Sequence, residues 1–226
     1  MVKLCTRSKS FFSFEKQNSQ NYQFKKGETM TINELATVRT GLVTARKKPE
    51  AGQTVYQYRL LNLKCIAEEG YIQTHAIEPY EASMELKPDY FTRMGDVLVR
   101  LSAPYTAVFI NREELCGLLV PSHFAIVRAR RGMAEPEYLY WLLRRNKNRI
   151  KMMQNSSGST AFGTISTGLI SALSVTPLPL AKQRALGELL ILTEREQELL
   201  HRLAVEKKKY SALLIDEIYN KMKRGF

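Results

Sequence analysis

Residues 177–190, PLPLAKQRALGELL, constrain this chain more than any other segment. Pro177 and Pro179 lack a backbone N–H and fix φ near −65°, so a preceding strand or helix ends there. From Ala181 onward there is no proline, and Gly187 is the only glycine before Gly225. The pattern predicts one continuous helix over 181–226, on the order of 60 Å long at about 1.5 Å per residue. Helices inside a compact domain usually have roughly 8–20 residues, so we expect this helix to reach a partner.

The length and composition suit one globular domain with an appendage. The chain has 226 residues, of which 44% are apolar and 25% charged. No apolar run approaches the roughly 20 residues that cross a bilayer, and Lys, Arg and Ser interrupt the N-terminal apolar run, so we expect a cytoplasmic protein without a membrane contact. Cys5, Cys65 and Cys116 are odd in number and form no CxxC pair. They indicate reduced thiols rather than a disulfide framework or a zinc ribbon.

The net charge of +12 favours a polyanionic partner, most simply nucleic acid. The excess is spread along the chain: six basic residues and one acidic in 1–26, 18 and 14 in 27–180, and 10 and 7 in 181–226. A basic protein without a nucleic-acid partner has the same overall charge. The charge therefore needs support from local motifs.

Hydrophobic periodicity divides the chain into three parts: a basic N-terminal extension (1–26), a domain (27–180) and the long helix (181–226). Within the domain, apolar residues at period two predict strands. These are 54–63, 96–102, 106–111 and 123–129, and a short strand precedes Pro177. Short helices are expected from Thr31, whose spacing to Glu34 fits a capping box, over 135–146 and near 166–171. The expected fold class is α+β, with a mixed or antiparallel sheet.

The sequence shows no active site. It has no glycine-rich phosphate loop. Glu78-Pro79-Tyr80 is the nearest string to the Asp/Asn-Pro-Pro-aromatic segment of DNA methyltransferases, and it lacks the amide and the second proline. His75, His123 and His201 are isolated from each other, and His123 lies in an apolar run, where we expect a core histidine. We therefore expect a non-catalytic protein that holds no metal and no cofactor itself.

Two clusters in the first half of the domain are candidates for DNA contact. Arg46, Lys47 and Lys48 form a basic cluster in the segment 45–52 that favours phosphate binding, although a solvated loop has the same composition. Gln57 and Arg59 share one face of the predicted strand 54–63. Their side chains are the types that bond bidentately to adenine and guanine edges.

Further candidates lie in two turns. Arg100, Ser102 and Tyr105 lie at the end of the predicted strand 96–102 and at the Ala103-Pro104 turn. The hydroxyl-rich segment NSSGST has a glycine hinge, which suits close approach to a backbone but is also typical of linkers. From it we select Ser157, Ser159 and Thr160 as candidate DNA contacts.

The long helix carries an apolar seam that Glu196 and Lys207 interrupt. A helix of this composition cannot bury such a seam alone, so another helix must cover it. The chain's own domain is one candidate cover, and a second copy of the helix is the other. We expect dimerisation through an antiparallel coiled coil formed by Leu189, Leu192, Leu199, Leu203, Tyr210, Leu214 and Ile218.

Over roughly residues 30–224 the sequence resembles the specificity (S) subunits of type I restriction–modification systems, in a half-length form with one target-recognition domain. TPLPLAKQRALGELL is similar to the family's Ile-Pro-x-Pro-x-x-x-x-Gln-x-x-Ile start of a long helix. Other similar segments are INELATVRTG, MGDVLVRLSAPY, EPEYLYWLL and SGST. Their order and spacing together are more specific than any one of them.

The resemblance implies a subunit that reads double-stranded DNA and holds the methyltransferase (M) subunits, through which the restriction (R) subunit joins. S-adenosylmethionine is then expected on the methyltransferase. Full-length members have two recognition domains separated by two antiparallel helices, and read two half-sites with an unspecified gap. This chain has one domain and one helix, so the resemblance implies a homodimer that reads a bipartite, palindromic site.

Three alternatives stay open at this point. One is a DNA-modifying enzyme, a nuclease or methyltransferase with a non-standard site. Another is a stand-alone dimeric DNA-binding regulator or anti-restriction protein. The third is a recognition cassette that is silent until recombined.

Overall fold

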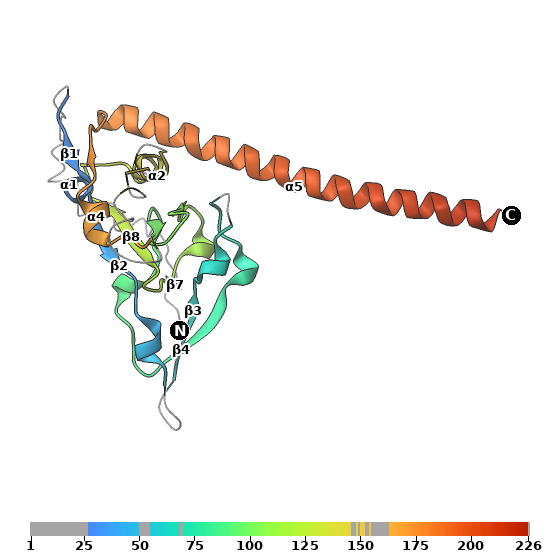
Figure 1. Ribbon diagram of the computed structural model, residues 1–226, viewed down its shortest axis with the longest axis horizontal. Coiled ribbons are helices and arrows are strands. Elements are labelled where there is room, and N and C mark those ends of the chain that lie inside the picture. Colours follow the sequence, from blue (N-terminus) through green and yellow to red (C-terminus); the bar gives the residue numbers. More distant parts are fainter. Residues whose placement is uncertain are drawn as a thin grey trace, which may run out of the picture. The chain divides into compact units, whose positions relative to one another are not determined.

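The computed structural model describes residues 27–49, 55–67, 70–145, 148, 150–151, 154 and 163–225. They form two compact units. The first ends at Gly187 and is called here the globular unit; the second is the rest of the C-terminal helix, from Glu188. The expected α+β fold with one long C-terminal helix is confirmed (Figure 1).

The globular unit is built on a four-stranded antiparallel sheet in the order β2-β8-β5-β6. The strands are β2 (Ala36–Thr40), β5 (Val97–Arg100), β6 (Ala107–Phe109) and β8 (Phe124–Ala129). Val97, Leu98 and Val99 are all fully buried, which means that both faces of the sheet are covered.

One face of this sheet packs on α2 (Pro136–Arg144), where the Tyr140 ring stacks on Phe109 with centroids 5.4 Å apart. The other face forms the main core, in which Leu98, Val108 and Ile126 of the sheet pack on Leu61, Cys65 and Leu118. Pro136 at the first helical position has no N–H to leave unpaired, which explains why α2 begins there.

A second, three-stranded sheet has the order β4-β3-β7. β3 (Tyr56–Leu60) pairs antiparallel with β4 (Glu78–Ala82) along its whole length, but with β7 (Leu118–Leu119) only at Arg59 and Leu60. The opposite end of β3 and β4 is therefore a two-stranded ribbon. β1 (Met30–Thr31) and β9 (Ser174–Val175) form a short antiparallel pair.

Several short elements differ from the expectation. The capping box at Thr31 is confirmed, but α1 (Ile32–Leu35) ends after four residues and β2 follows at once. Thr37, Val38 and Thr40 are β-branched and fit an extended strand better than a helix. β2 and β4 were missed in the sequence. Residues 44–47 form a 3₁₀ turn, η2 (Thr44–Lys47), where a loop was expected.

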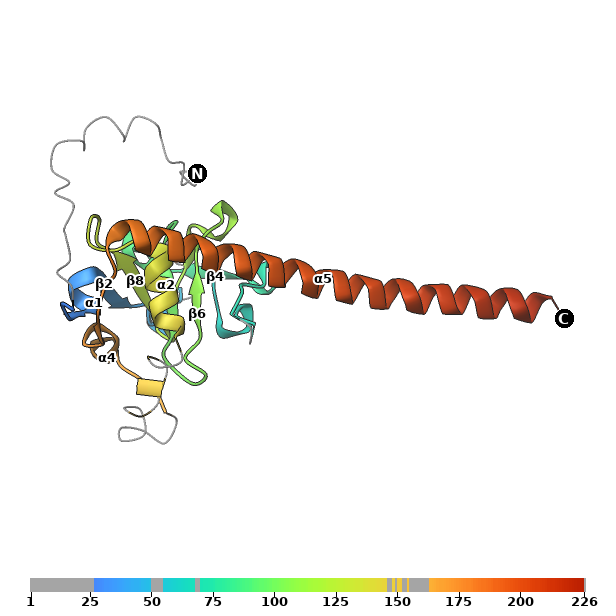
Figure 2. The same cartoon turned by 90° about the horizontal axis from the view of Figure 1, so that it is seen from above.

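The helix predicted over 181–226 is confirmed as α5 (Leu180–Arg224), which has 45 residues and follows the short helix α4 (Thr167–Ser171) and β9 (Figure 2). Only Gln183 and Gly187 are buried in it, and both belong to the globular unit. No described helix has the length and apolar content of a membrane span.

Candidate nucleic-acid interface

The predicted cluster at Arg46, Lys47 and Lys48 lies at the open end of the β3–β4 ribbon. The hydroxyl of Tyr80 donates to the Thr44 carbonyl at 2.7 Å, and the Ser83 N–H donates to the Lys47 carbonyl at 2.9 Å. These bonds hold η2 against β4. We define the ribbon tip as Val43, η2, Lys48, Val55, Tyr56, Ser83 and Met84.

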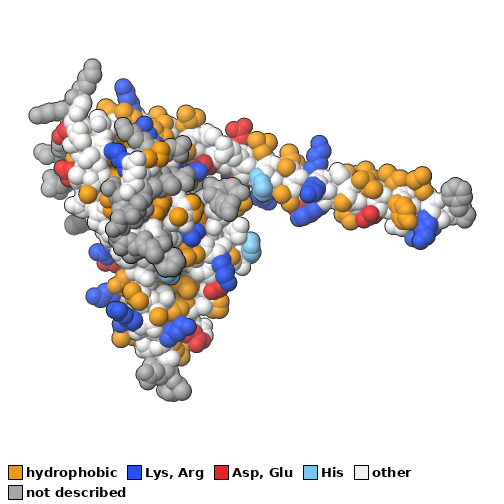
Figure 3. Space-filling model, viewed as in Figure 1, with side chains coloured by type: hydrophobic (Ala, Val, Ile, Leu, Met, Phe, Trp, Pro, Cys, Tyr) orange, Lys and Arg blue, Asp and Glu red, His pale blue; other side chains and the backbone are white. Residues whose placement is uncertain are grey.

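The three basic side chains of the ribbon tip differ in exposure. Arg46 and Lys48 are exposed, whereas Lys47 is half-buried with its Nζ 3.5 Å from the sulfur of Met84. The structure therefore replaces the expected loop with an anchored turn that presents cations at its surface. In Figure 3, Lys and Arg side chains lie beside hydrophobic ones on the lower part of the globular unit.

Gln57 and Arg59 lie on the outer face of β3, as the alternation predicts. Gln57 is exposed and stands opposite Glu81 of β4. The Arg59 guanidinium donates to the carbonyls of Glu114 and Cys116, at 3.3 Å each. Arg59 thus joins β3 to the segment before β7, and its contact with DNA stays a prediction.

Arg100 and Ser102 lie at the same end of the four-stranded sheet as the start of η2. Thr40 pairs with Ala125, and Ala125 pairs with Val99, so β2 and β5 end side by side across β8. Two strand spacings separate them, about 10 Å. The Arg100 Nε donates to the Ser102 hydroxyl at 3.0 Å. The fold therefore places Arg100 and Ser102 at the end of the sheet from which the chain leads into η2.

Tyr105 is placed differently from the expectation. It is only 3% exposed, has a φ of 56°, and its hydroxyl donates to the Gly163 carbonyl. Burial favours a structural role for Tyr105 over the expected contact with DNA. Ser157, Ser159 and Thr160 lie outside the described residues.

His123 is exposed, so the expectation of a core histidine is wrong. β8 begins one residue later, at Phe124, and His123 lies before the strand rather than inside it. It is at the same end of the sheet as Arg100, because Leu101 N–H donates to its carbonyl at 2.9 Å.

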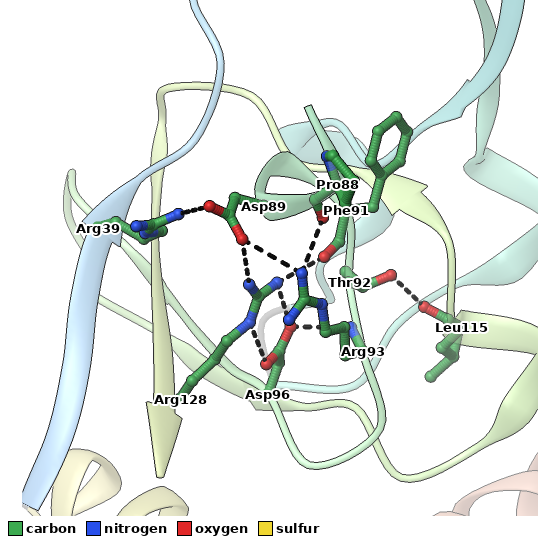
Figure 4. Close-up of polar contacts among 9 residues, drawn as sticks. All are labelled: Arg39, Pro88, Asp89, Phe91, Thr92, Arg93, Asp96, Leu115 and Arg128. Carbon is green, nitrogen blue, oxygen red and sulfur yellow. Dashed lines mark hydrogen bonds and ion pairs between the residues drawn. The ribbon is translucent and has the colours of Figure 1, made fainter. Parts of the chain in front are cut away.

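An arginine–aspartate network was missed in the sequence (Figure 4). Arg128 of β8 binds the Asp96 carboxylate with two bonds, of 2.8 and 3.1 Å. Asp89 of the 3₁₀ turn η5 (Pro88–Tyr90) pairs with Arg39 of β2, with Arg93 at 3.2 Å and with Arg128 at 3.6 Å. The network ties η5 to β2 and β8. No local spacing relates Arg39 to Asp89, so only the fold brings them together.

The two carboxylates of this network shift in opposite directions. The hydrogen bond from Arg39, helped by the charges of Arg93 and Arg128, lowers the pKa of Asp89 below its ordinary value of 3.8. Asp96 is 2% exposed, and burial raises its pKa although Arg128 acts against the shift. The arginines around Asp89 thus favour its ionised form. For the buried Asp96, desolvation disfavours the ionised form more than Arg128 favours it.

Cys65 and Cys116 are buried thiols without a disulfide, and burial raises the pKa of Cys65. Within the part of the chain that the structure describes, no group of three His, Cys, Asp or Glu side chains could hold a metal ion.

The start of α5 is packed into the globular unit. The Gln183 side chain accepts from the Glu135 N–H at 3.0 Å and donates to the Leu178 carbonyl at 2.7 Å. A Cβ at Gly187 would lie 2.5 Å from the Cβ of Glu137 on α2, so glycine allows this close approach. The glutamine and glycine of the 177–190 segment thus anchor the first turns of the helix.

Beyond Gly187 the predicted seam is exposed. The least exposed of its residues is Leu214, at 42%, and the most exposed is Leu192, at 67%. In Figure 3, hydrophobic side chains are visible along α5. All seven predicted residues meet solvent in the single chain: Leu189, Leu192, Leu199, Leu203, Tyr210, Leu214 and Ile218.

Comparison with known proteins identifies the fold. No protein-family model and no curated protein matches the sequence. Among solved structures, the HsdS subunit from Thermoanaerobacter tengcongensis matches with a TM-score of 0.54 at 22% identity, over 87% of this chain and 49% of that one. The chain has the fold of about half of an HsdS subunit. The resemblance found in the sequence is therefore confirmed at the level of the fold.

A second solved chain, from a study of complex assembly and conformational transition of the type I R-M system, matches with a TM-score of 0.57. It is 20% identical, and the match covers 85% of this chain and 48% of that chain. This chain thus spans about half the length of either of these HsdS-like structures.

Proposed function

We propose that this chain is a DNA-recognition subunit of a type I restriction–modification system that acts as a homodimer. One observation carries the proposal: a globular unit with the fold of half an HsdS subunit continues directly into a 45-residue helix with an exposed apolar seam. In the proposal, the globular unit reads double-stranded DNA and α5 pairs with a second copy. The alternative of a DNA-modifying enzyme with a non-standard site has no such support from the fold.

Pairing with a second copy follows from the seam. Leu192, Leu199 and Leu203 recur at the spacing of seven and four that brings side chains to one face of a helix. A symmetric pair is the commonest assembly and would cover both seams at once. An antiparallel pair of helices about 65 Å long would place one globular unit near each end. Two half-sites one turn apart are already about 34–36 Å distant, so this spacer fits a bipartite palindromic site.

DNA binding is supported by charge and by the ribbon tip. The chain carries +12, and the ribbon tip presents Arg46 and Lys48 at its surface. Gln57, exposed on the adjacent outer face of β3, has the side chain that pairs with adenine edges. Phosphate contacts would then orient the globular unit while side chains on β3 read bases.

In this proposal the chain itself is not catalytic. Chemistry belongs to methyltransferase (M) subunits, which carry S-adenosylmethionine, and to a restriction (R) subunit that joins through them. The chain's part is to position them on DNA and to set the distance between half-sites. We expect this division of roles because the chain has an HsdS-like fold. Modification of DNA by the assembled complex, and not by this chain alone, tests it.

The dimer is tested by one change on the seam and one off it. Leu203 is 64% exposed, and Val205 lies two residues on, about 200° around the helix, at 39% exposure. We expect the native chain and Val205→Asp to have twice the chain mass of 25.9 kDa by light scattering at micromolar concentration. Leu203→Asp buries a charge in the seam and should be a monomer. A native monomer would overturn the dimer.

A stand-alone dimeric DNA-binding regulator is the second candidate, because the ribbon tip and the exposed seam fit it equally well. Such a protein binds its site without a methyltransferase and directs no methylation. Co-expression with a type I methyltransferase subunit separates the two. New adenine methylation that depends on this chain supports the recognition subunit, and site-specific binding without methylation supports the regulator.

A further inference from the structure

Exposed apolar side chains outside α5 are concentrated at the ribbon tip. Six large apolar side chains of the described globular unit are exposed, and four of them belong to the ribbon tip. They are Val43 at 44%, Val55 at 42%, Tyr56 at 39% and Met84 at 48%; the other two are Met94 and Ile150. Single exposed apolar residues are normal on a protein surface, but a group of four around one turn indicates a binding surface.

The group is held together by the fold. Tyr56 pairs with Ala82, two residues before Met84, and the Lys47 carbonyl accepts from the Ser83 N–H. Behind the surface, Ala82 is fully buried and Tyr80 is 6% exposed. The exposed apolar side chains are therefore next to buried residues of β4, which fix the backbone that carries them.

The charges around this surface indicate which part of DNA it fits. Arg46, Lys47 and Lys48 are cationic, whereas Glu81 and Glu85 are exposed carboxylates on the β4 side. Carboxylates repel phosphates, so this mixture of charges favours a surface that also meets base edges. Base edges in the major groove present acceptors, donors and the thymine methyl group, which match cations, carboxylates and apolar side chains respectively.

We propose that the ribbon tip enters the major groove and that Met84, with Val43, contacts thymine methyl groups of the recognition site. This inference rests on the proposed DNA recognition, and it identifies the thymine methyl group as one feature that the ribbon tip reads. A two-stranded ribbon fits the major groove, which is about 12 Å wide. Lys47, in contact with the Met84 sulfur, would hold that side chain while Arg46 and Lys48 reach phosphates.

The test removes the methyl group and nothing else. Duplexes are first selected from a random library with the full chain, co-expressed with a type I methyltransferase subunit. Each thymine of the selected site is then replaced by deoxyuridine, one position at a time. At one or more positions we expect binding to weaken by about threefold to fourfold for each methyl group that becomes buried.

Two protein variants assign the effect to the ribbon tip. Met84→Gln should bind the thymine site more weakly and lose the difference between thymine and deoxyuridine. Met94→Gln is the matched control, because Met94 is 44% exposed and lies in the turn before β5, away from the ribbon tip. It should keep the full difference. Fluorescence of Trp141, the only tryptophan, checks that both variants are folded.

The outcomes separate this inference from the proposed function. A library that yields no preferred site contradicts the DNA-recognition proposal itself. A preferred site at which no deoxyuridine substitution changes the affinity contradicts the inference only. A difference that Met84→Gln leaves intact also overturns it, because another surface then reads the methyl group.

Discussion

Leu98 in β5 and Leu203 in α5 are the same side chain in opposite surroundings, fully buried in one case and 64% exposed in the other. The globular unit covers both faces of its central sheet, whereas α5 has no buried residue beyond Gly187. Burial of apolar surface is the main favourable term in folding. The globular unit therefore buries its apolar core within one chain, whereas the apolar seam of α5 stays exposed in one chain.

The largest expected difference in stability is between alanine substitutions of these two leucines. Leu98→Ala leaves a cavity in a packed core and should cost about 3 kcal/mol of unfolding free energy. Leu203→Ala should leave the unfolding of the globular unit unchanged within about 0.5 kcal/mol. Urea unfolding followed by Trp141 fluorescence measures this unit, because Trp141 lies in α2. Equal losses of unfolding free energy would contradict the difference in burial between the two leucines.

The next effect concerns the anchor of α5. Gln183→Leu leaves the Glu135 N–H and the Leu178 carbonyl without their partner, and should cost about 2 kcal/mol in the same assay. Gln197→Leu makes the same change at an exposed site of the same helix. Its cost should stay within about 0.5 kcal/mol. A neutral Gln183→Leu would show that the buried amide is not an anchor.

A smaller effect compares two basic pairs, one in each region. Arg46→Gln with Lys48→Gln should lower the slope of log affinity against log salt by about 2, since each phosphate contact contributes about 0.9. Lys208→Gln with Lys209→Gln, on exposed residues of α5, should leave that slope unchanged. Binding to the selected duplex is measured by fluorescence anisotropy between 50 and 200 mM salt. The reverse result would move the DNA contact from the ribbon tip to the helix.

The smallest effect is the pH dependence of the arginine–aspartate network. The pKa of Asp89 is lower in the folded chain than its ordinary value of 3.8, so its ionised form stabilises the fold above that pH. The stabilisation is lost as pH falls through the lowered pKa. Asp89→Asn should therefore be less stable than the native chain near pH 7, with a difference that shrinks below about pH 4. Urea unfolding over pH 3–7 measures it; a constant difference contradicts this origin.

Local patterns predicted the parts of the fold whose burial is regular. β5, β6 and β8 follow alternation or short apolar runs, and α5 follows from the prolines before it and the lack of proline after it. β2 and β4 were missed for different reasons. β2 pairs with β8 about 90 residues on, and β4 contains Pro79, which weakens a strand pattern.

The candidate site was predicted in pieces. The basic triplet at Arg46 was visible as composition, but its anchoring by Tyr80 and Ser83 depends on tertiary contacts. Met84 and Val43 carried no signal, because exposure of an apolar residue cannot be read from its neighbours. The burial of Tyr105 carried no local signal either, because its hydroxyl donates to the carbonyl of Gly163, 58 residues away. Residue types in the sequence suggested which side chains could bind DNA, whereas their exposure and anchoring follow only from the fold.

We propose that two copies of this chain read one DNA site, and methylation mapping is the sharpest test of that proposal. The chain is expressed with a type I methyltransferase subunit in cells that lack other adenine methylation, and every methylated adenine in the genome is located by sequencing. The proposed homodimer predicts a bipartite motif whose two halves are inverted repeats separated by an unspecified gap. An asymmetric motif, or no methylation that depends on this chain, would contradict it.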